Sequence, residues 1–252
     1  MKVLLLGGTT EAAVLARLLA ADPRFDATLS LAGRTKSPAA SPLPTLVGGF
    51  GGAKGLLAYL LENKVDALVD ATHPYAAQMT MHAVEAATDC DTALLALRRP
   101  AWEQQPGDRW QQVADAEAAV AALGADPKRV FLSMGRLEIH SFVRAPQHDY
   151  LIRSVDHPGD LPMPYVTVIT AKGPFDPAAE AALLKQHRIE VLVSKNSGGS
   201  ATYGKIQAAR DLGVPVIMLA RPTLPWADSV TGPEAAMAWL AAHHEALAQR
   251  GV

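Results

Sequence analysis

The chain of 252 residues is long enough for one large domain or for two smaller ones that each bury a core. Its formal net charge of -2 provides no basic field of the kind that binds a phosphate backbone, so we expect no nucleic-acid partner. The single cysteine, Cys90, can form no disulfide within the chain and lacks the Cys/His spacing of a zinc site, so we expect neither a metal nor an oxidising compartment.

An export signal and a membrane span are both absent from the predicted elements. Glycine ends the first apolar run, residues 3–6, which is too short for the core of a signal peptide. No later stretch approaches the ~20 uninterrupted apolar residues that cross a bilayer. We therefore expect a cytoplasmic protein without a membrane partner.

The N-terminal part of the chain alternates short apolar runs with amphipathic segments. Ala12, Leu15, Ala16 and Leu19 fall on one face of a helix, and Asp22-Pro23 ends that segment. Strands are predicted at residues 3–6, 27–32, 45–47, 67–70 and 92–97, and further helices at 54–63 and 75–87. This repeated alternation of strand and helix indicates a doubly wound parallel sheet.

A charged, proline-bearing stretch at residues 98–108 is typical of a connection between domains, and we place a boundary near residue 100. Beyond it, strands are predicted at 130–133, 165–170, 191–194 and 214–219, and helices at 177–187, 202–212 and 234–247. The chain is thus predicted to form two Rossmann-like, doubly wound parallel-sheet α/β domains, 1–100 and 101–252. The C-terminal strand and helix can pack on either domain, so the limits stay open at that end.

A glycine-bearing turn links the first predicted strand to the first helix, where the pyrophosphate of a dinucleotide meets backbone N–H groups and the positive helix end. Its sequence is Gly7-Gly8-Thr9-Thr10-Glu11-Ala12. Gly7 and Ala12 match the pattern G-x-G-x-x-G/A, whereas Thr9 replaces the middle glycine. We expect a cofactor site in which the hydroxyls of Thr9 and Thr10 compensate; a plain turn capped by threonine is the structural alternative.

The end of the second predicted strand carries cations where NAD-binding folds carry a carboxylate. The sequence there is Gly33-Arg34-Thr35-Lys36. A guanidinium, a hydroxyl and an ammonium suit the 2′-phosphate of NADP, so we predict that Arg34 and Thr35 bind NADPH. A solvated basic turn is the alternative, and it fits Lys36 better than Arg34.

The carboxyl end of the fourth predicted strand has the sequence Asp70-Ala71-Thr72-His73-Pro74-Tyr75. Ligands of open α/β sheets bind outside such strand ends, so we expect Thr72 and His73 near the cofactor. Pro74 suits a first helical turn, and Thr72 or His73 could instead cap the helix that follows.

A second anion-binding loop is predicted in the C-terminal half, where Ser194-Lys195-Asn196-Ser197-Gly198-Gly199-Ser200 follows a strand. It offers backbone N–H groups, hydroxyls, an amide and the ammonium of Lys195. Lys205 on the next helix, with Lys172 and Arg136 after two other strands, adds cations to the same predicted rim. Residues 198–202 resemble the nucleophile elbow G-x-S-x-G, but Thr202 replaces its last glycine, which argues against a serine hydrolase. A flexible surface loop is the alternative.

These motifs together resemble the precorrin-6A reductase family, which includes the cobalt-precorrin-6A reductases. The resemblance rests on Leu6-Gly7-Gly8-Thr9-Thr10-Glu11, Asp70-Ala71-Thr72-His73-Pro74-Tyr75-Ala76, Ser194-Lys195-Asn196-Ser197-Gly198-Gly199 and Pro215-Val216-Ile217-Met218-Leu219-Ala220-Arg221-Pro222. It runs nearly end to end, and the middle two motifs are the specific ones. It implies the NADPH-dependent reduction of a ring double bond of precorrin-6A, giving precorrin-6B in cobalamin biosynthesis.

A precorrin carries several acetate and propionate arms, so scattered cations suit it, and its width calls for a cleft between the two domains. We expect the cofactor to bind Gly7, Gly8, Thr9, Thr10, Glu11, Arg34, Thr35, Thr72 and His73. We expect the tetrapyrrole to bind Arg136, Lys172, Lys195, Asn196, Ser197, Gly198, Gly199 and Lys205. The proton donor stays open between His73, Tyr75, Lys195 and solvent.

Other classes of protein share parts of this sequence pattern. A short-chain dehydrogenase is excluded because no tyrosine of the chain is followed four residues later by lysine. A non-catalytic NADP sensor would bind cofactor through residues 7–34 and contact a protein through its second domain. Another NADPH-dependent reductase of a large anionic substrate also fits these motifs. The sequence does not fix the oligomeric state, and a monomer is compatible with it.

Overall fold

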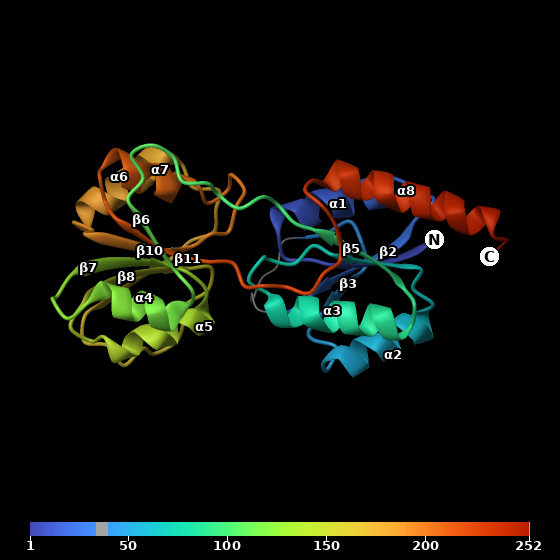
Figure 1. The fold of residues 1–252 in the computed structure, drawn as a ribbon, viewed down its shortest axis with the longest axis horizontal. Helices are drawn as coiled ribbons and strands as arrows, with labels where there is room; N and C mark the ends of the chain where they lie inside the picture. Colours follow the sequence, from blue (N-terminus) through green and yellow to red (C-terminus); the bar gives the residue numbers. More distant parts are fainter. Residues whose placement is uncertain (34–39, 252) are drawn as a thin grey trace. The chain divides into compact units, whose positions relative to one another are not determined.

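The computed structural model describes residues 1–33 and 40–251, apart from the side chains of residues 136 and 137. Contacts within the chain divide it into two compact units, which we call unit 1 (Met1–Pro100 with Pro222–Val252) and unit 2 (Ala101–Arg221). Each unit is a parallel sheet with helices on its faces (Figure 1). The predicted α/β class with two doubly wound sheets is therefore confirmed.

Unit 1 is built on a sheet of order β12-β5-β4-β1-β2-β3 in its described part, with every pair of strands parallel. The strands are β1 (Lys2–Leu6), β2 (Asp26–Leu31), β3 (Thr45–Val47), β4 (Ala67–Asp70), β5 (Ala93–Leu97) and β12 (Asp228–Val230). The helices are α1 (Thr10–Ala20), α2 (Ala53–Asn63), α3 (Ala77–Asp89) and α8 (Pro233–Gln249).

The two faces of this sheet are covered by different helices because successive side chains of a strand point to opposite sides. Val3 and Leu5 of β1 belong to the cluster that includes Leu15 of α1 and Leu240 of α8. Their neighbours in β1, residues 4 and 6, pack instead with residues of α2 and α3. The strand is thus buried on both faces, which explains its uninterrupted apolar sequence.

Unit 2 repeats this plan with a sheet of order β6-β11-β10-β7-β8-β9. The strands are β6 (Trp110–Val113), β7 (Arg129–Ser133), β8 (Asp149–Ser154), β9 (Val166–Thr170), β10 (Val191–Lys195) and β11 (Val216–Leu219). The helices are α4 (Ala116–Leu123), α5 (Arg136–Ile139), the 3-10 helix η1 (His140–Arg144), α6 (Pro177–Gln186) and α7 (Gly204–Asp211). A core cluster joins Phe131 and Leu192 of the sheet to Leu184 of α6 and Ile206 of α7.

The outermost strand of each sheet is exchanged between the units. From the third strand inward, unit 1 runs β3-β2-β1-β4-β5 and ends in β12, while unit 2 runs β9-β8-β7-β10-β11 and ends in β6. In the chain, however, β6 follows β5 and β12 follows β11. Both sheets therefore have the strand order 3-2-1-4-5-6 of a Rossmann fold. In each sheet, however, the sixth strand comes from the segment of chain that follows the fifth strand of the other sheet.

This exchange determines where the C-terminal elements lie. β11 belongs to unit 2, whereas β12 pairs with β5 and α8 packs on α1 in unit 1. The sequence pattern had left the C-terminal strand and helix open between the two domains. The second unit ends at Arg221 rather than at the end of the chain.

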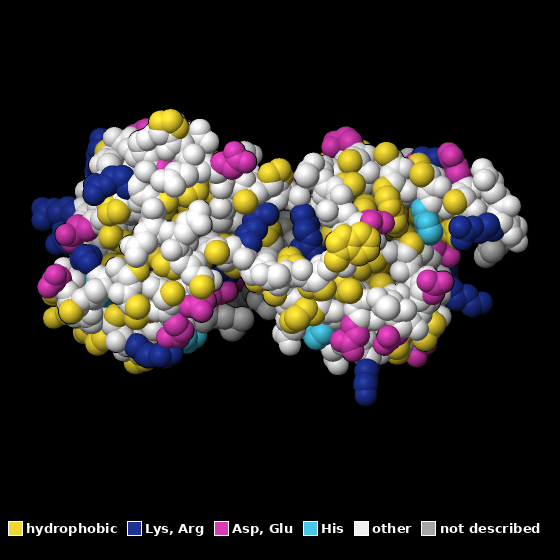
Figure 2. Space-filling view, in the orientation of Figure 1, with side chains coloured by type: hydrophobic (Ala, Val, Ile, Leu, Met, Phe, Trp, Pro, Cys, Tyr) yellow, Lys and Arg dark blue, Asp and Glu magenta, His cyan; other side chains and the backbone are white. Residues whose placement is uncertain are grey.

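Charged side chains of both signs are interspersed on the face shown in Figure 2, with dark blue and magenta groups in each unit. This distribution matches the near balance of 23 basic and 25 acidic residues. Of the helices in the described residues, none combines the length and the apolar composition needed to cross a bilayer.

A buried ion pair joins β8 to α6 in unit 2. The guanidinium of Arg153 donates to both carboxylate oxygens of Glu180, at 2.5 and 2.7 Å, and both side chains are at most 5% exposed. The guanidinium also lies 3.7 Å from the ring centroid of Phe175. Each of these buried charges is neutralised by the other, so loss of one partner leaves an unpaired buried charge.

We expect Glu180→Ala to lower the free energy of unfolding of unit 2 by about 3–5 kcal/mol, since it strands the Arg153 cation. The control is Glu117→Ala, which removes the partner of Arg144 from a pair whose side chains are 50% and 69% exposed and should cost at most about 1 kcal/mol. Hydrogen exchange of the β8 and α6 amides measures both effects. Equal losses in the two variants would contradict the structural role given to the buried pair.

Candidate cofactor and substrate sites

The turn after β1 is held by backbone pairing and by one threonine. Gly7 donates its amide to the carbonyl of Ser30 at 2.9 Å, which continues the ladder between β1 and β2. Gly8 has a φ of 118°, a backbone conformation that side chains disfavour, so the second glycine is required for geometry. The turn then delivers the chain to the first residue of α1, Thr10.

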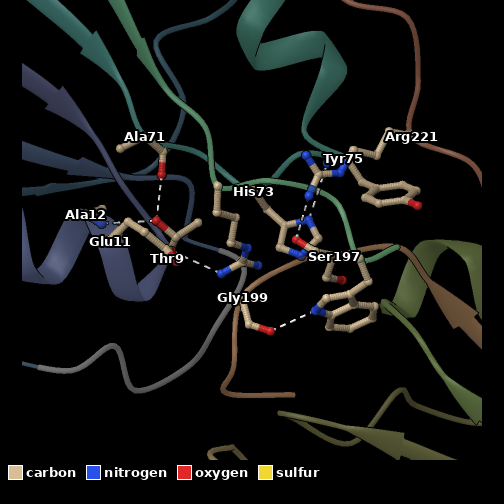
Figure 3. A network of polar contacts seen from close by, with 11 residues as sticks. Thr9, Glu11, Ala12, Ala71, His73, Tyr75, Ser197, Gly199 and Arg221 are labelled. Carbon is tan, nitrogen blue, oxygen red and sulfur yellow. Dashed lines mark hydrogen bonds and ion pairs between the residues drawn. The ribbon is translucent and has the colours of Figure 1, made fainter. Parts of the chain in front are cut away.

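Thr9 is the N-cap of α1 and also ties two strand ends together. Its hydroxyl accepts from the amide of Ala12 at 3.1 Å and donates to the carbonyl of Ala71 at 2.8 Å (Figure 3). β1 and β4 are neighbours in the sheet, and the strand order changes direction between them. Ligands of such sheets bind at this switch point. The Thr9 hydroxyl thus satisfies the Ala12 amide, which leaves the amides of Thr10 and Glu11 as the first-turn groups of α1 that could bind an anion.

Glu11 forms an ion pair with Arg99 across the same edge of the sheet. The Arg99 Nη1 atom lies 3.0 Å from the Glu11 Oε2 atom, and the side chains are 13% and 19% exposed. Sequence reasoning assigned the segment around Arg99 to a connection between domains and missed this pair. No local pattern could have revealed it, because the two residues are 88 positions apart.

Asp70, at the end of β4, is a buried carboxylate that organises the residues around it. It is 3% exposed and accepts hydrogen bonds from the Thr72 amide at 3.1 Å and from the Thr72 and Thr80 hydroxyls, both at 2.6 Å. Arg98 Nη2 approaches it at 3.5 Å. Because the Thr72 hydroxyl donates its proton to Asp70, only its lone pairs remain for a further hydrogen bond.

His73 and Tyr75 lie side by side in the segment that leads into α3 (Figure 3). The Tyr75 amide donates to His73 Nδ1 at 3.3 Å, and the two ring centroids are 5.7 Å apart. α3 begins at Ala77, and its N-cap, Ala76, makes no side-chain capping bond. The alternative in which Thr72 or His73 caps this helix is therefore wrong, and so is the predicted helix start at residue 75.

In unit 2, Lys195 and Glu138 form an ion pair at the corresponding switch point, between β10 and β7. The Lys195 Nζ atom lies 2.5 Å from Glu138 Oε1, and the side chains are 12% and 28% exposed. Gly135 makes room for this pair, because an added Cβ would lie 2.7 Å from Glu138 Oε2. Glu138 was not among the predicted site residues.

Asn196 directs its side chain into unit 2. Its Oδ1 atom accepts from the Trp102 amide at 2.7 Å, and its Nδ2 atom donates to the Trp102 carbonyl at 2.9 Å. The Trp102 indole N–H donates to the carbonyl of Gly199 at 2.8 Å. The loop expected to bind substrate is thus fastened to the segment that opens unit 2.

The remaining predicted cations lie in different surroundings. Lys172 is exposed beyond the carboxyl end of β9, as a rim residue should be. Lys205 is only 3% exposed, with its Nζ atom 5.5 Å from the ring centroid of Trp102. Arg34 and Thr35, predicted to bind the 2′-phosphate, lie outside the described residues, as does the side chain of Arg136.

We expect Thr9→Ala to lower the free energy of unfolding of unit 1 by about 1–2 kcal/mol, because it removes the N-cap of α1 and the hydrogen bond to Ala71. Thr9→Ser keeps the hydroxyl and serves as the matched control. Hydrogen exchange of the α1 and β4 amides measures the difference. If alanine and serine behave alike, the threonine hydroxyl does not hold the turn.

The comparisons with known proteins agree over nearly the whole chain. The model of the family described as precorrin-6x reductase CbiJ/CobK matches residues 2–241. A precorrin-6A reductase of Rhodobacter capsulatus is 49% identical over 243 residues, which cover 96% of each chain. One from a Sinorhizobium species is 54% identical, covering 87% of this chain and 85% of the relative.

The same family is found among solved structures. A structure described as CobK precorrin-6A reductase superimposes with a TM-score of 0.92 at 48% identity, covering 96% of this chain and 97% of the other. The resemblance drawn from the sequence motifs is confirmed. With its two Rossmann-like sheets and its full-length match to these relatives, the chain belongs to the precorrin-6x reductase family.

Proposed function

We propose that this chain reduces a ring double bond of precorrin-6A, giving precorrin-6B, with hydride from NADPH. The observation that carries this proposal is the near-complete match to relatives that are named precorrin-6A reductase and are 49% and 54% identical. Because both names refer to precorrin-6A without cobalt, we take the cobalt-free macrocycle as the substrate. The reaction belongs to cobalamin biosynthesis.

The turn of unit 1 fits the pyrophosphate of a nicotinamide dinucleotide. An added Cβ on Gly7 would lie 2.6 Å from the Leu29 Cδ1 atom, so a larger residue would require the Leu29 side chain to move, and Gly8 takes a conformation suited to glycine. The amides of the first turn of α1 suit an anion, and Arg99 adds a cation held by Glu11. NADPH bound at this edge supplies the hydride.

The preference for NADPH over NADH rests on residues 33–36. The run Gly33-Arg34-Thr35-Lys36 follows β2 and contains no carboxylate to hold a ribose 2′-hydroxyl. Arg34 and Thr35 instead suit a 2′-phosphate. We assign these two residues to cofactor specificity on the sequence pattern alone.

The substrate is a polycarboxylate, and the second group of edge residues suits its arms. Lys172 and Arg136 follow β9 and β7, and Lys195 is the last residue of β10; the carboxyl ends of these parallel strands meet at one edge of the sheet. Binding energy from the arms orients the macrocycle, and orientation accounts for much of the rate of a hydride transfer. His73, Tyr75 and the ammonium of Lys195 are our candidates for the proton that completes the reduction.

The direct test mixes the purified full-length protein with NADPH and precorrin-6A. We expect the nicotinamide absorbance to fall while the spectrum of the macrocycle shifts, with slower turnover of the cobalt-containing macrocycle. Binding of NADPH without any oxidation in the presence of precorrin-6A would refute the proposal and would favour a non-catalytic NADP sensor.

We expect Arg34→Ala to weaken NADPH binding about 10- to 100-fold while changing NADH binding little, because a charge-assisted hydrogen bond contributes roughly 1.5–3 kcal/mol. Arg24→Ala is the control, since Arg24 pairs with Asp22 at the opposite end of α1. Dissociation constants from fluorescence titration measure both. Equal weakening of the two nucleotides would remove Arg34 from the 2′-phosphate site.

A further inference from the structure

The loop after β10 has three of its carbonyl groups bound by two side chains of unit 2. Arg221 Nε donates to the carbonyl of Asn196 at 3.0 Å. Arg221 Nη2 donates to that of Ser197 at 3.2 Å (Figure 3). The Trp102 indole N–H binds the carbonyl of Gly199 at 2.8 Å. Trp102, Asn196 and Ser197 are each 9% exposed, so this fastening is well shielded from water.

These contacts fix the direction of the amides that follow. In a planar trans peptide the C=O and the next N–H point in opposite directions. With the Ser197 carbonyl turned to Arg221, the Gly198 N–H points away from Arg221. With the Gly199 carbonyl turned to Trp102, the Ser200 N–H points away from Trp102. Each of these two amides is therefore turned away from the side chain that binds the preceding carbonyl.

Two consecutive left-handed glycines lie between these two peptides, and the N–H groups there have no partner in the part of the protein that the structure describes. Gly198 and Gly199 have φ values of 70° and 71°, both left-handed. Within residues 1–33 and 40–251, the amides of Gly198, Gly199 and Ser200 donate to no protein acceptor. Three successive backbone N–H groups of this loop are thus left to bind an anion.

We propose that Gly198, Gly199 and Ser200 bind one carboxylate arm of the substrate through their backbone amides, and that Trp102 and Arg221 are positioning residues that hold the loop in this state. The proposal rests on the proposed function for the identity of the substrate, a carboxylate-bearing tetrapyrrole. It also changes the role of Asn196. Its side chain clamps the Trp102 backbone, which places the indole N–H, rather than binding the substrate itself.

The chain offers a matched pair of tryptophans for the test. Trp102 uses its indole N–H to hold Gly199, whereas the indole N–H of Trp110 on β6 is buried without a partner among the described residues. Trp102→Phe keeps an aromatic ring and loses the anchoring hydrogen bond. Trp110→Phe makes the same chemical change in the same unit and loses no hydrogen bond.

In steady-state assays with NADPH, we expect Trp102→Phe to raise the KM for precorrin-6A about three- to tenfold, the range for one hydrogen bond. The KM for NADPH should stay unchanged, because its site is assigned to unit 1. Trp110→Phe should match the wild type in both constants. A Trp102→Phe enzyme with wild-type KM for precorrin-6A, or with equal changes for both substrates, would overturn the positioning role.

A binding measurement separates this inference from the proposed function. Uroporphyrin, a stable porphyrin with acetate and propionate arms, is titrated into the labelled wild-type protein while amide resonances are followed by NMR. We expect the resonances of Gly198, Gly199 and Ser200 to shift in the wild type and in Trp110→Phe, and to shift less in Trp102→Phe. If these resonances do not move in a protein that does reduce precorrin-6A, the inference is overturned and the proposed function stands. If they shift in a protein that shows no turnover, the inference stands and the proposed function is contradicted.

A second variant covers the case in which Trp102→Phe does not fold. Arg221→Lys retains the positive charge but cannot reach both the Asn196 and Ser197 carbonyls with one planar fork. It should give the same selective rise in the KM for precorrin-6A and the same loss of amide shifts. A wild-type response from Arg221→Lys would likewise count against the proposal.

Discussion

Backbone hydrogen bonds between parallel strands are the constraint on which both sites depend. They align Leu6 of β1 with Asp70 of β4 in unit 1, and Ser133 of β7 with Ser194 of β10 in unit 2. Residues that are more than 60 positions apart in the chain therefore end at one edge of each sheet. The pairing even continues past the strands, where the Ala71 amide donates to the carbonyl of Leu6. The register of the parallel strands therefore determines which residues meet at each candidate site.

At both edges, polar side chains bind other groups of the protein, and the ligand contacts that we propose there are made by backbone amides. The Thr9 hydroxyl is used by Ala12 and Ala71, and the Asn196 amide group is used by Trp102. The charged residues follow the same rule, since Glu11 pairs with Arg99 and Lys195 with Glu138. An anionic ligand at the proposed sites would thus meet cations that are already held in place, and less entropy would be lost on binding.

The sequence predicted the elements whose pattern is local. Apolar runs located β1, β4 and β10, and glycines marked the turns that follow β1 and β10. β8 was missed because its charged end, Arg153, is buried only with Glu180, a residue 27 positions away. β12 was missed because three residues become a strand only by pairing with β5. The roles of Arg99, Glu138 and Trp102 were likewise set by distant partners, so no local pattern could reveal them.

The exchanged strands explain why the anchoring residues of the second loop stand where they do. Since β6 and β12 fill the sixth positions of the two sheets, the chain passes between the units twice, entering unit 2 next to residue 101 and leaving it next to residue 221. Trp102 and Arg221 stand at those two points, and both bind the loop of residues 196–199. A stretch of chain entering a unit is free to move unless side chains fasten it. Here both stretches are fastened to one loop, so the order of that loop and the order of the two connections depend on the same few hydrogen bonds.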